Sequence, residues 1–263
     1  MYGQEKWICE PNLLKRWAYR LFGEVHVPGR LRAAYIQREM RRLGLTKASL
    51  RMLDAGSGRG DLAIHMAKRF PAWQVVGLEL EPEKVANSRL IAERLGLKNI
   101  EFCEGSLETF EAESKFDLIV NADVMEHIQD DRKVIANLCR ALRPGGHIIL
   151  TSPSVPQRKH LRLVAWREKR IGFQPSDYGH VRAGYSREDL DEKFAAVGAR
   201  VTRSYLTFGF FGTLAFDLFF VIGDNRPHPV LFALMFPFLM VLAELDLAFP
   251  SKTGSAILAV ASK

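Results

Sequence analysis

A glycine-rich loop that follows a short apolar run constrains the fold of this chain most. Arg51–Ala55 is mostly apolar and ends in Gly56-Ser57-Gly58-Arg59-Gly60, and Asp61–Phe70 has helical spacing. Glycines at a strand-to-helix turn let the backbone turn tightly and let a ligand approach the main chain. The N-terminus of the helix that follows favours a negatively charged group. The pattern therefore predicts a cofactor site at the end of a strand.

Short apolar runs and helical patterns continue to alternate along the chain. Further strands are predicted at 73–80, 99–104, 116–121, 147–152, 199–206 and 255–262, and helices at 83–95, 131–142 and 187–197. Pro144-Gly145-Gly146 is expected to form a turn before the strand at 147–152. Strands that alternate with helices at this spacing form a parallel sheet covered on both faces. We therefore expect an α/β fold with a doubly wound, mostly parallel seven-stranded sheet.

The spacing of the glycines separates two classes of nucleotide cofactor. A dinucleotide fingerprint requires GxGxxG, and its third glycine would fall on Asp61. The glycines instead follow the spacing GxGxG, with Asp54 two residues before the first. Glu79 closes the next predicted strand, where a carboxylate can accept hydrogen bonds from both hydroxyls of a ribose.

Three further segments join the glycine loop in one known pattern: VVGLELEPE, FDLIVNADVMEHIQD and LRPGGHIILTSPS, at the second, fourth and fifth strands. Together they resemble the class I S-adenosylmethionine (SAM)-dependent methyltransferases, in particular the small-molecule and lipid methyltransferases with a DxGxGxG loop. The resemblance covers about residues 45–155, the stretch Gly179–Arg182, Tyr185-Ser186 and the last strand. It implies a Rossmann-like fold and SAM as the cofactor.

The resemblance also implies which residues hold the cofactor. The glycine loop would hold the methionine end, Glu79 the ribose, and Leu80 would pack on adenine. Members of the group have Gly-Asp after the third strand, whereas this chain has Gly105-Ser106, so the adenine contact would pass to Ser106 or to a backbone group. The expected cofactor-binding residues are Asp54, Gly56, Ser57, Gly58, Gly60, Glu79, Leu80, Ser106, Leu107 and Asn121.

The methyl acceptor is less constrained by the sequence. Methyltransferases of exocyclic base amines often carry Asn/Asp-Pro-Pro-aromatic after the fourth strand, and this chain has Asn121-Ala122-Asp123-Val124. For a phenol or carboxyl acceptor, a histidine is the side chain best suited to remove a proton near neutral pH. The expected catalytic residues are His180, His127 and Tyr185, with His180 preferred, and the expected acceptor-binding residues are Tyr178, Arg182 and Asp123.

Charge and cysteine usage limit the partners. The chain carries a formal net charge of +7, and residues 1–50 contribute ten Lys/Arg against four Glu. Such a basic face suits anionic headgroups, nucleic acid or an acidic substrate. The three cysteines are far apart and the seven histidines lack metal-ligand spacing, which predicts no metal site and a reducing cytosol. Residues 1–25 show no secretory signal pattern.

The segment from Tyr205 to Phe249 holds ten of the seventeen phenylalanines. Two apolar arms, 208–223 and 230–243, flank a polar turn, and each is about 24 Å long or less as a helix. Both are shorter than the roughly 30 Å hydrocarbon core of a bilayer. We expect a hairpin that lies on a membrane, or else one that covers the sheet or forms a dimer interface.

The sequence as a whole favours one domain, residues 1–263. Basic helices are expected at 11–24 and 30–43 within 1–44, with His26-Val27-Pro28-Gly29 between them. A loop-rich acceptor-side insertion occupies 154–186, and the apolar hairpin occupies 208–249. The expected function is SAM-dependent methylation of an apolar or lipid-like small molecule, with O-methylation favoured, on the cytoplasmic face of a membrane. Two alternatives remain: a non-catalytic SAM-binding scaffold at the membrane, and an RNA methyltransferase.

Overall fold

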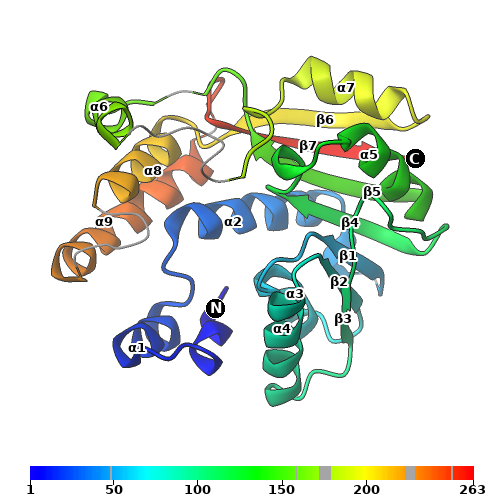
Figure 1. Ribbon diagram of the computed structural model, residues 1–263, viewed down its shortest axis with the longest axis horizontal. Coiled ribbons are helices and arrows are strands. Elements are labelled where there is room, and N and C mark those ends of the chain that lie inside the picture. Colours follow the sequence, from blue (N-terminus) through cyan, green and yellow to red (C-terminus); the bar gives the residue numbers. More distant parts are fainter. Residues whose placement is uncertain (48, 158, 172–178, 223–228, 250) are drawn as a thin grey trace.

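The computed structural model describes residues 1–263 except 48, 158, 172–178, 223–228 and 250 (Figure 1). Within the described residues, seven strands form one sheet in the order β3-β2-β1-β4-β5-β7-β6. The strands are β1 (Arg51–Ala55), β2 (Gln74–Glu79), β3 (Ile100–Glu104), β4 (Phe116–Ala122), β5 (Leu142–Pro153), β6 (Arg200–Thr207) and β7 (Ala256–Ser262). Only the pairs that involve β7 are antiparallel. The predicted fold class is confirmed.

Helices cover both faces of this sheet. Buried side chains of α2 (Val27–Arg42), α3 (Asp61–Arg69) and α4 (Pro82–Arg94) share one apolar cluster. Those of α5 (Asp131–Ala141) and α7 (Arg187–Ala195) belong to a second cluster. The remaining elements are η1 (Gln4–Ile8), α1 (Leu13–Phe22), η2 (Leu45–Lys47), η3 (Met125–His127), α6 (Arg162–Ile171), α8 (Phe210–Ile222) and α9 (Pro229–Ala248).

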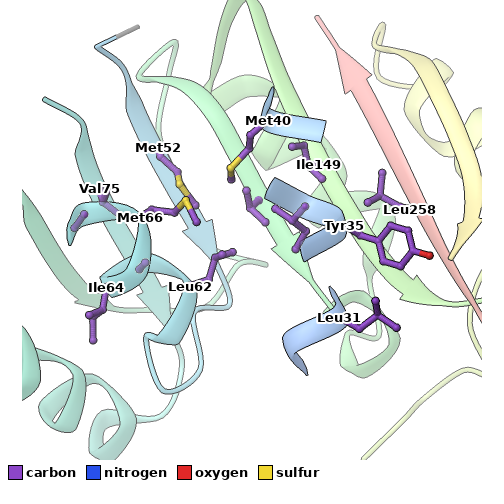
Figure 2. Packing of buried hydrophobic residues seen from close by; sticks show 14 of the residues in the cluster. Leu31, Tyr35, Met40, Met52, Leu62, Ile64, Met66, Val75, Ile149 and Leu258 are labelled. Atoms are coloured by element: carbon purple, nitrogen blue, oxygen red, sulfur yellow. The ribbon is translucent and has the colours of Figure 1, made fainter. Parts of the chain in front are cut away.

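Helix α2 packs its apolar side directly on the sheet. Figure 2 shows Leu31, Tyr35 and Met40 of α2 reaching the strands near Ile149 of β5 and Leu258 of β7. Fully burying an aliphatic side chain contributes about 1.5–3 kcal/mol, so this face of α2 holds the helix firmly. Its N-terminal end is thereby fixed above the carboxyl ends of the central strands, where the site lies.

The apolar hairpin differs from its prediction in length. Helix α9 has 20 residues rather than the predicted 14. Its stretch Leu231–Ala248 has a mean hydropathy of 2.0 and is long and apolar enough to cross a membrane by length and composition alone. Its inner face, with Leu239, Leu242 and Ala243, is buried in the same core cluster as α2. The hairpin therefore packs on α2 with one face and exposes the other.

A buried carboxylate explains how a charged residue fits near the end of this apolar helix. Asp246 accepts hydrogen bonds from the Tyr35 hydroxyl at 2.6 Å and from the backbone N–H of Gly212 at 2.8 Å. Burying an unpaired carboxylate would be costly, and these donors offset that cost. Asp246 thus joins α9 to α2 and to the start of α8.

Three local predictions need correction. His26-Val27-Pro28-Gly29 was expected to lie between two helices; the two helices are separate, but α2 begins at Val27, because proline is tolerated in a first helical turn. Residues 144–146 were expected to form a turn, but β5 runs through them with a shift in its register to β4. The predicted loop-rich segment 154–186 contains helix α6.

Candidate active site

A cavity of about 820 Å³ opens at the carboxyl ends of β1, β2 and β4. This is the edge at which open α/β sheets bind their ligands. Two walls of different origin face each other across it. The sheet side includes the glycine loop and the residues after β2, β3 and β4, and the opposite side includes Tyr2 and the start of α2.

The glycine loop forms one end of the cavity. Gly56, Gly58 and Gly60 all have positive φ, at 83°, 54° and 75°. A Cβ on Gly56 would lie 2.5 Å from the Val124 side chain, and one on Gly60 would lie 2.8 Å from Phe102. At Gly58 a Cβ would meet no described atom within 4 Å, and this residue lines the cavity. Two glycines therefore close the turn, and the third leaves room for a ligand.

Glu79 lies beside this loop at the end of β2. Its carboxylate accepts hydrogen bonds from the backbone N–H of Gly58 at 2.8 Å and of Glu81 at 3.1 Å. Each carboxylate oxygen has further lone pairs, so Glu79 can also accept from the two hydroxyls of a ribose. These hydrogen bonds thus hold the glycine loop and Glu79, the residue predicted to bind the ribose, in a fixed relative position.

Most of the other predicted cofactor residues line the same cavity: Asp54, Ser57, Leu80, Ser106 and Leu107. Burial, with smaller contributions from Asp61 and Glu79, raises the pKa of Asp54 to about 7, although its carboxylate accepts from the N–H of Ala63. The hydroxyl of Ser57 is buried and has no hydrogen-bond partner among the described residues. A buried hydroxyl is costly unless it is paired, so its position fits a ligand with a polar group.

Two predicted cofactor residues are absent from the described cavity lining: Gly60, which closes the glycine loop, and Asn121. Asn121 is fully buried in β4. Its side-chain amide donates to the carbonyl oxygen of Ala55 at 2.9 Å. The structure therefore places Asn121 behind the glycine loop, where it joins β4 to β1.

The opposite wall contributes residues that sequence reasoning missed. Arg32 of α2 forms an ion pair with Asp123, which follows β4 and adopts a positive φ of 53°. Asp123 also accepts a hydrogen bond from the Thr151 hydroxyl at 2.9 Å. Ala33 and Ile36 add apolar surface to the same wall. The helical spacing of residues 30–43 was visible in the sequence, but it carried no signal for which side of the sheet this helix would cover.

Two histidines that were predicted as catalytic meet at the rim of the cavity. Their rings contact edge to face with centroids 4.7 Å apart, and His127 lines the cavity. Nδ1 of His127 lies 3.2 Å from the carbonyl oxygen of Gly179. Because a carbonyl only accepts, Nδ1 carries the hydrogen, and Nε2 of a neutral ring is left as the proton acceptor. Burial, together with His127, lowers the pKa of His180.

A buried glutamate stands beside these histidines. Glu126 accepts a hydrogen bond from the Ser152 hydroxyl at 3.0 Å. Burial and the nearby Asp123 raise the pKa of Glu126 to about 8. The ligand atoms of Glu126, His127 and His180 lie within 4.8 Å of one another, a proximity that the linear spacing did not reveal. A carboxyl group that is neutral at pH 7 is a poor metal ligand, and the absence of a metal stays a prediction.

Two other predicted residues point away from the described lining of the cavity. Arg182 pairs with the buried Asp131 and donates to the carbonyl oxygens of Ile128 and Gln129 at 2.8 and 2.9 Å. The Tyr185 hydroxyl donates to Asp131 at 2.7 Å, and burial raises the pKa of Tyr185 to about 12. These contacts hold the segment after η3 in place. Tyr178 lies outside the described residues.

Comparisons with known proteins agree with this geometry. The sequence model of the family "Methyltransferase domain" matches residues 46–179, just over half of the chain. The demethylmenaquinone methyltransferase of Thermus thermophilus is 31% identical over an alignment of 185 positions, and the match covers 64% of this chain and 82% of that protein. The ubiquinone biosynthesis O-methyltransferase of Rickettsia prowazekii is 24% identical over 59% of this chain and 61% of that protein. The chain thus spans less than two thirds of the second relative.

A solved structure shows the same fold. Phosphoethanolamine N-methyltransferase 2 of Haemonchus contortus, in complex with S-adenosyl-L-methionine, superposes with a TM-score of 0.57 at 19% identity. The match covers 82% of this chain and 49% of that one. The glycine loop, Glu79 and the Ser57 hydroxyl, which has no partner among the described residues, fit the same cofactor. The chain therefore belongs to the methyltransferase-domain family and is a class I SAM-dependent methyltransferase.

Proposed function

We propose that this enzyme methylates an oxygen of an apolar, lipid-like small molecule, such as a hydroxylated ring, at a membrane surface. The observation that carries the proposal is the wall opposite the glycine loop. Ala33 and Ile36 supply apolar contact there and Arg32 a positive charge, and Asp123 and His127 line the cavity from the sheet side. An apolar acceptor with one acidic hydroxyl matches this distribution, because pockets bind through apolar surface and orient through a few polar groups.

The chemistry asks little of the protein beyond alignment and removal of a proton. When bound, SAM supplies an electrophilic methyl group on its sulfonium. The cavity walls align the acceptor oxygen, which supplies several kcal/mol of the barrier reduction in well-oriented reactions. Nε2 of His127 accepts the hydroxyl proton, because Nδ1 donates its hydrogen to the carbonyl oxygen of Gly179. His180, which packs on the His127 ring, is then a positioning residue.

Arg32 has a complementary role in the proposal. A phenolate or carboxylate is more nucleophilic than its neutral form, and a guanidinium nearby favours the anion. Arg32 already pairs with Asp123 at the cavity wall, so an anionic acceptor would compete with that carboxylate for the same cation. The names of the two relatives also support a quinone-like acceptor and, for the second, O-methylation.

The membrane surface is supported by the outer face of the apolar hairpin. Leu234 on α9 is 73% exposed, and Phe238 and Val241 are exposed beside it. Large exposed apolar patches mark binding sites for membranes or other proteins. A lipid-like acceptor dissolved in a bilayer would have a short path to an enzyme that binds there.

A lipid-extract assay tests the proposed function. The protein is incubated with SAM that carries a labelled methyl group and with a membrane lipid extract, and the organic and aqueous phases are counted. We expect label in the organic phase that depends on the enzyme and is lost in Glu79→Ala. Label that appears only with added RNA, or only in water-soluble products, would overturn the proposal.

A further inference from the structure

Helix α1 (Leu13–Phe22) has the form of a surface helix with an unpartnered apolar face. None of its residues is buried. Leu14 and Trp17 are 75% and 59% exposed, and Leu13 and Leu21 are also exposed. At 3.6 residues per turn, these four side chains fall within an arc of about 100°. Exposure of such a continuous apolar stripe to water does not stabilise the helix, whereas burial against another apolar surface would.

Cations border this stripe. The helix contains Lys15, Arg16 and Arg20 and no acidic residue. Arg20 lies over the rings of Trp7 and Trp17, at 5.1 and 5.5 Å from their centroids. A helix with leucine and tryptophan on one face and lysine and arginine beside it is typical of helices that lie in the interface of an anionic bilayer.

The position of α1 in the fold gives the stripe its context. Figure 1 places α1, α6, α8 and α9 at one end of the long axis of the molecule, away from the sheet. Phe22 at the end of α1 contacts Phe236 of α9 edge to face, with ring centroids 5.7 Å apart. Exposed apolar side chains on the other helices of this end include Trp166, Phe216, Leu234, Phe238 and Val241.

From these observations we propose that α1 is a membrane-docking helix, which inserts Leu13, Leu14, Trp17 and Leu21 into an anionic lipid bilayer. Arg16 and Arg20, which flank this arc, bind the headgroups at its rim, and Lys15 adds positive charge to the helix. The inference names the element that binds the membrane, and its biological meaning rests on the proposed function. The physical evidence for it is the exposed apolar stripe and the cations of α1.

A second copy of the chain is the other candidate for covering this face. In a two-fold dimer the same patch lies on both sides of the interface. Contact through α1 would therefore bring three cations of one copy toward the same three cations of the other. Like charges across an interface are costly, whereas anionic headgroups complement them. The charge of α1 thus favours the bilayer.

The helix is also joined to the wall of the active site. Lys6, in the preceding η1, forms ion pairs with Glu24 and, at 2.9 Å, with Asp61. Asp61 and Tyr2 both line the cavity. Docking through α1 would therefore set the end of the molecule that carries Tyr2 against the bilayer, the solvent of a lipid-like acceptor.

Vesicle binding of the full chain tests the proposal. Vesicles of phosphatidylcholine with about one third phosphatidylglycerol, and vesicles of phosphatidylcholine alone, are sedimented with the wild type and with Leu14→Ser/Trp17→Ser. We expect at least about tenfold weaker binding of this double variant to the anionic vesicles. Lys15→Gln/Arg16→Gln removes two cations and leaves the apolar stripe; it should weaken binding to the anionic vesicles alone.

Controls separate docking from folding and from association. Leu90→Ser, an exposed leucine of α4, should bind as the wild type does, and all variants should keep their SAM affinity and thermal unfolding midpoint. Wild-type vesicle binding by the α1 variants would overturn the proposal. So would loss of a dimer in light scattering without loss of vesicle binding, since the second copy would then be the occupant.

The outcomes also keep this inference apart from the proposed function. If the wild type docks through α1 but no lipid in the extract accepts a methyl group, the docking helix stands and the proposed acceptor class fails. If detergent-dispersed lipid is methylated while the α1 variants bind vesicles normally, the acceptor class stands and the docking helix fails.

Discussion

Removal of the Glu79 carboxylate should weaken SAM binding without unfolding the enzyme. The side chain lines the cavity and is held by the N–H groups of Gly58 and Glu81. Hydrogen bonds to a charged group contribute about 1.5–3 kcal/mol. At about 1.4 kcal/mol for each tenfold change in affinity, Glu79→Ala should raise the Kd for SAM roughly 10- to 150-fold. Titration calorimetry measures this change directly.

The same two backbone contacts require a control, because they also order the glycine loop. Glu83→Ala removes an exposed carboxylate from the first turn of the next helix and should leave the Kd unchanged. Urea unfolding of ligand-free Glu79→Ala shows how much of the effect is lost loop order. Unchanged SAM affinity in Glu79→Ala, or tighter binding of NAD than of SAM, would refute the assignment of Glu79 to the ribose.

Three further predictions concern the hairpin, the buried glutamate and the histidines. Phe236 is 8% exposed and Phe238 is 48% exposed. In urea titrations, Phe236→Ser should therefore lower the free energy of unfolding by about 3 kcal/mol or more, and Phe238→Ser by about 0.5 kcal/mol or less. Equal effects would contradict the packing of α9. The pKa of Glu126 is raised to about 8, so between pH 4.5 and 8 the native state holds a proton that the unfolded state has released. The free energy of unfolding should therefore fall as the pH rises through this range, by at most about 1.4 kcal/mol per pH unit. Glu126→Gln should flatten this slope. His127→Ala should lower kcat at least about tenfold, or about 1.4 kcal/mol of barrier, with SAM affinity retained and with a smaller loss for His180→Ala; the reverse order would restore His180 as the base.

The cofactor half of the site could be predicted because its signals are local. Gly56, Gly58 and Gly60 stand next to one another in the chain, and their left-handed conformations are a property of that turn. The position of Glu79 could be predicted because Glu79 ends the next strand, and neighbouring parallel strands end at the same edge of the sheet. Motif and site therefore coincide there.

The acceptor half could not be predicted because its contacts join distant segments. Arg32 meets Asp123 only because α2 packs across the sheet with its N-terminal end above β4. The packing of α2 also determines where the hairpin lies. The apolar composition of the hairpin suits a membrane and a protein core equally, so the sequence alone did not separate the two. Asn121 and Arg182 show the converse error: both stand near the predicted site in the sequence, but their hydrogen bonds to Ala55 and Ile128 direct them elsewhere.

The position of the transferred methyl group tests the account most directly. Protein, SAM with a ¹³C-labelled methyl group and a membrane lipid extract are incubated together, and the organic-phase product is analysed by mass spectrometry and carbon NMR. An apolar acceptor wall with His127 at its rim predicts one methyl group on an oxygen, seen as a methoxy resonance of an apolar product. A methyl group on carbon or nitrogen, or label confined to RNA or a water-soluble product, would contradict it.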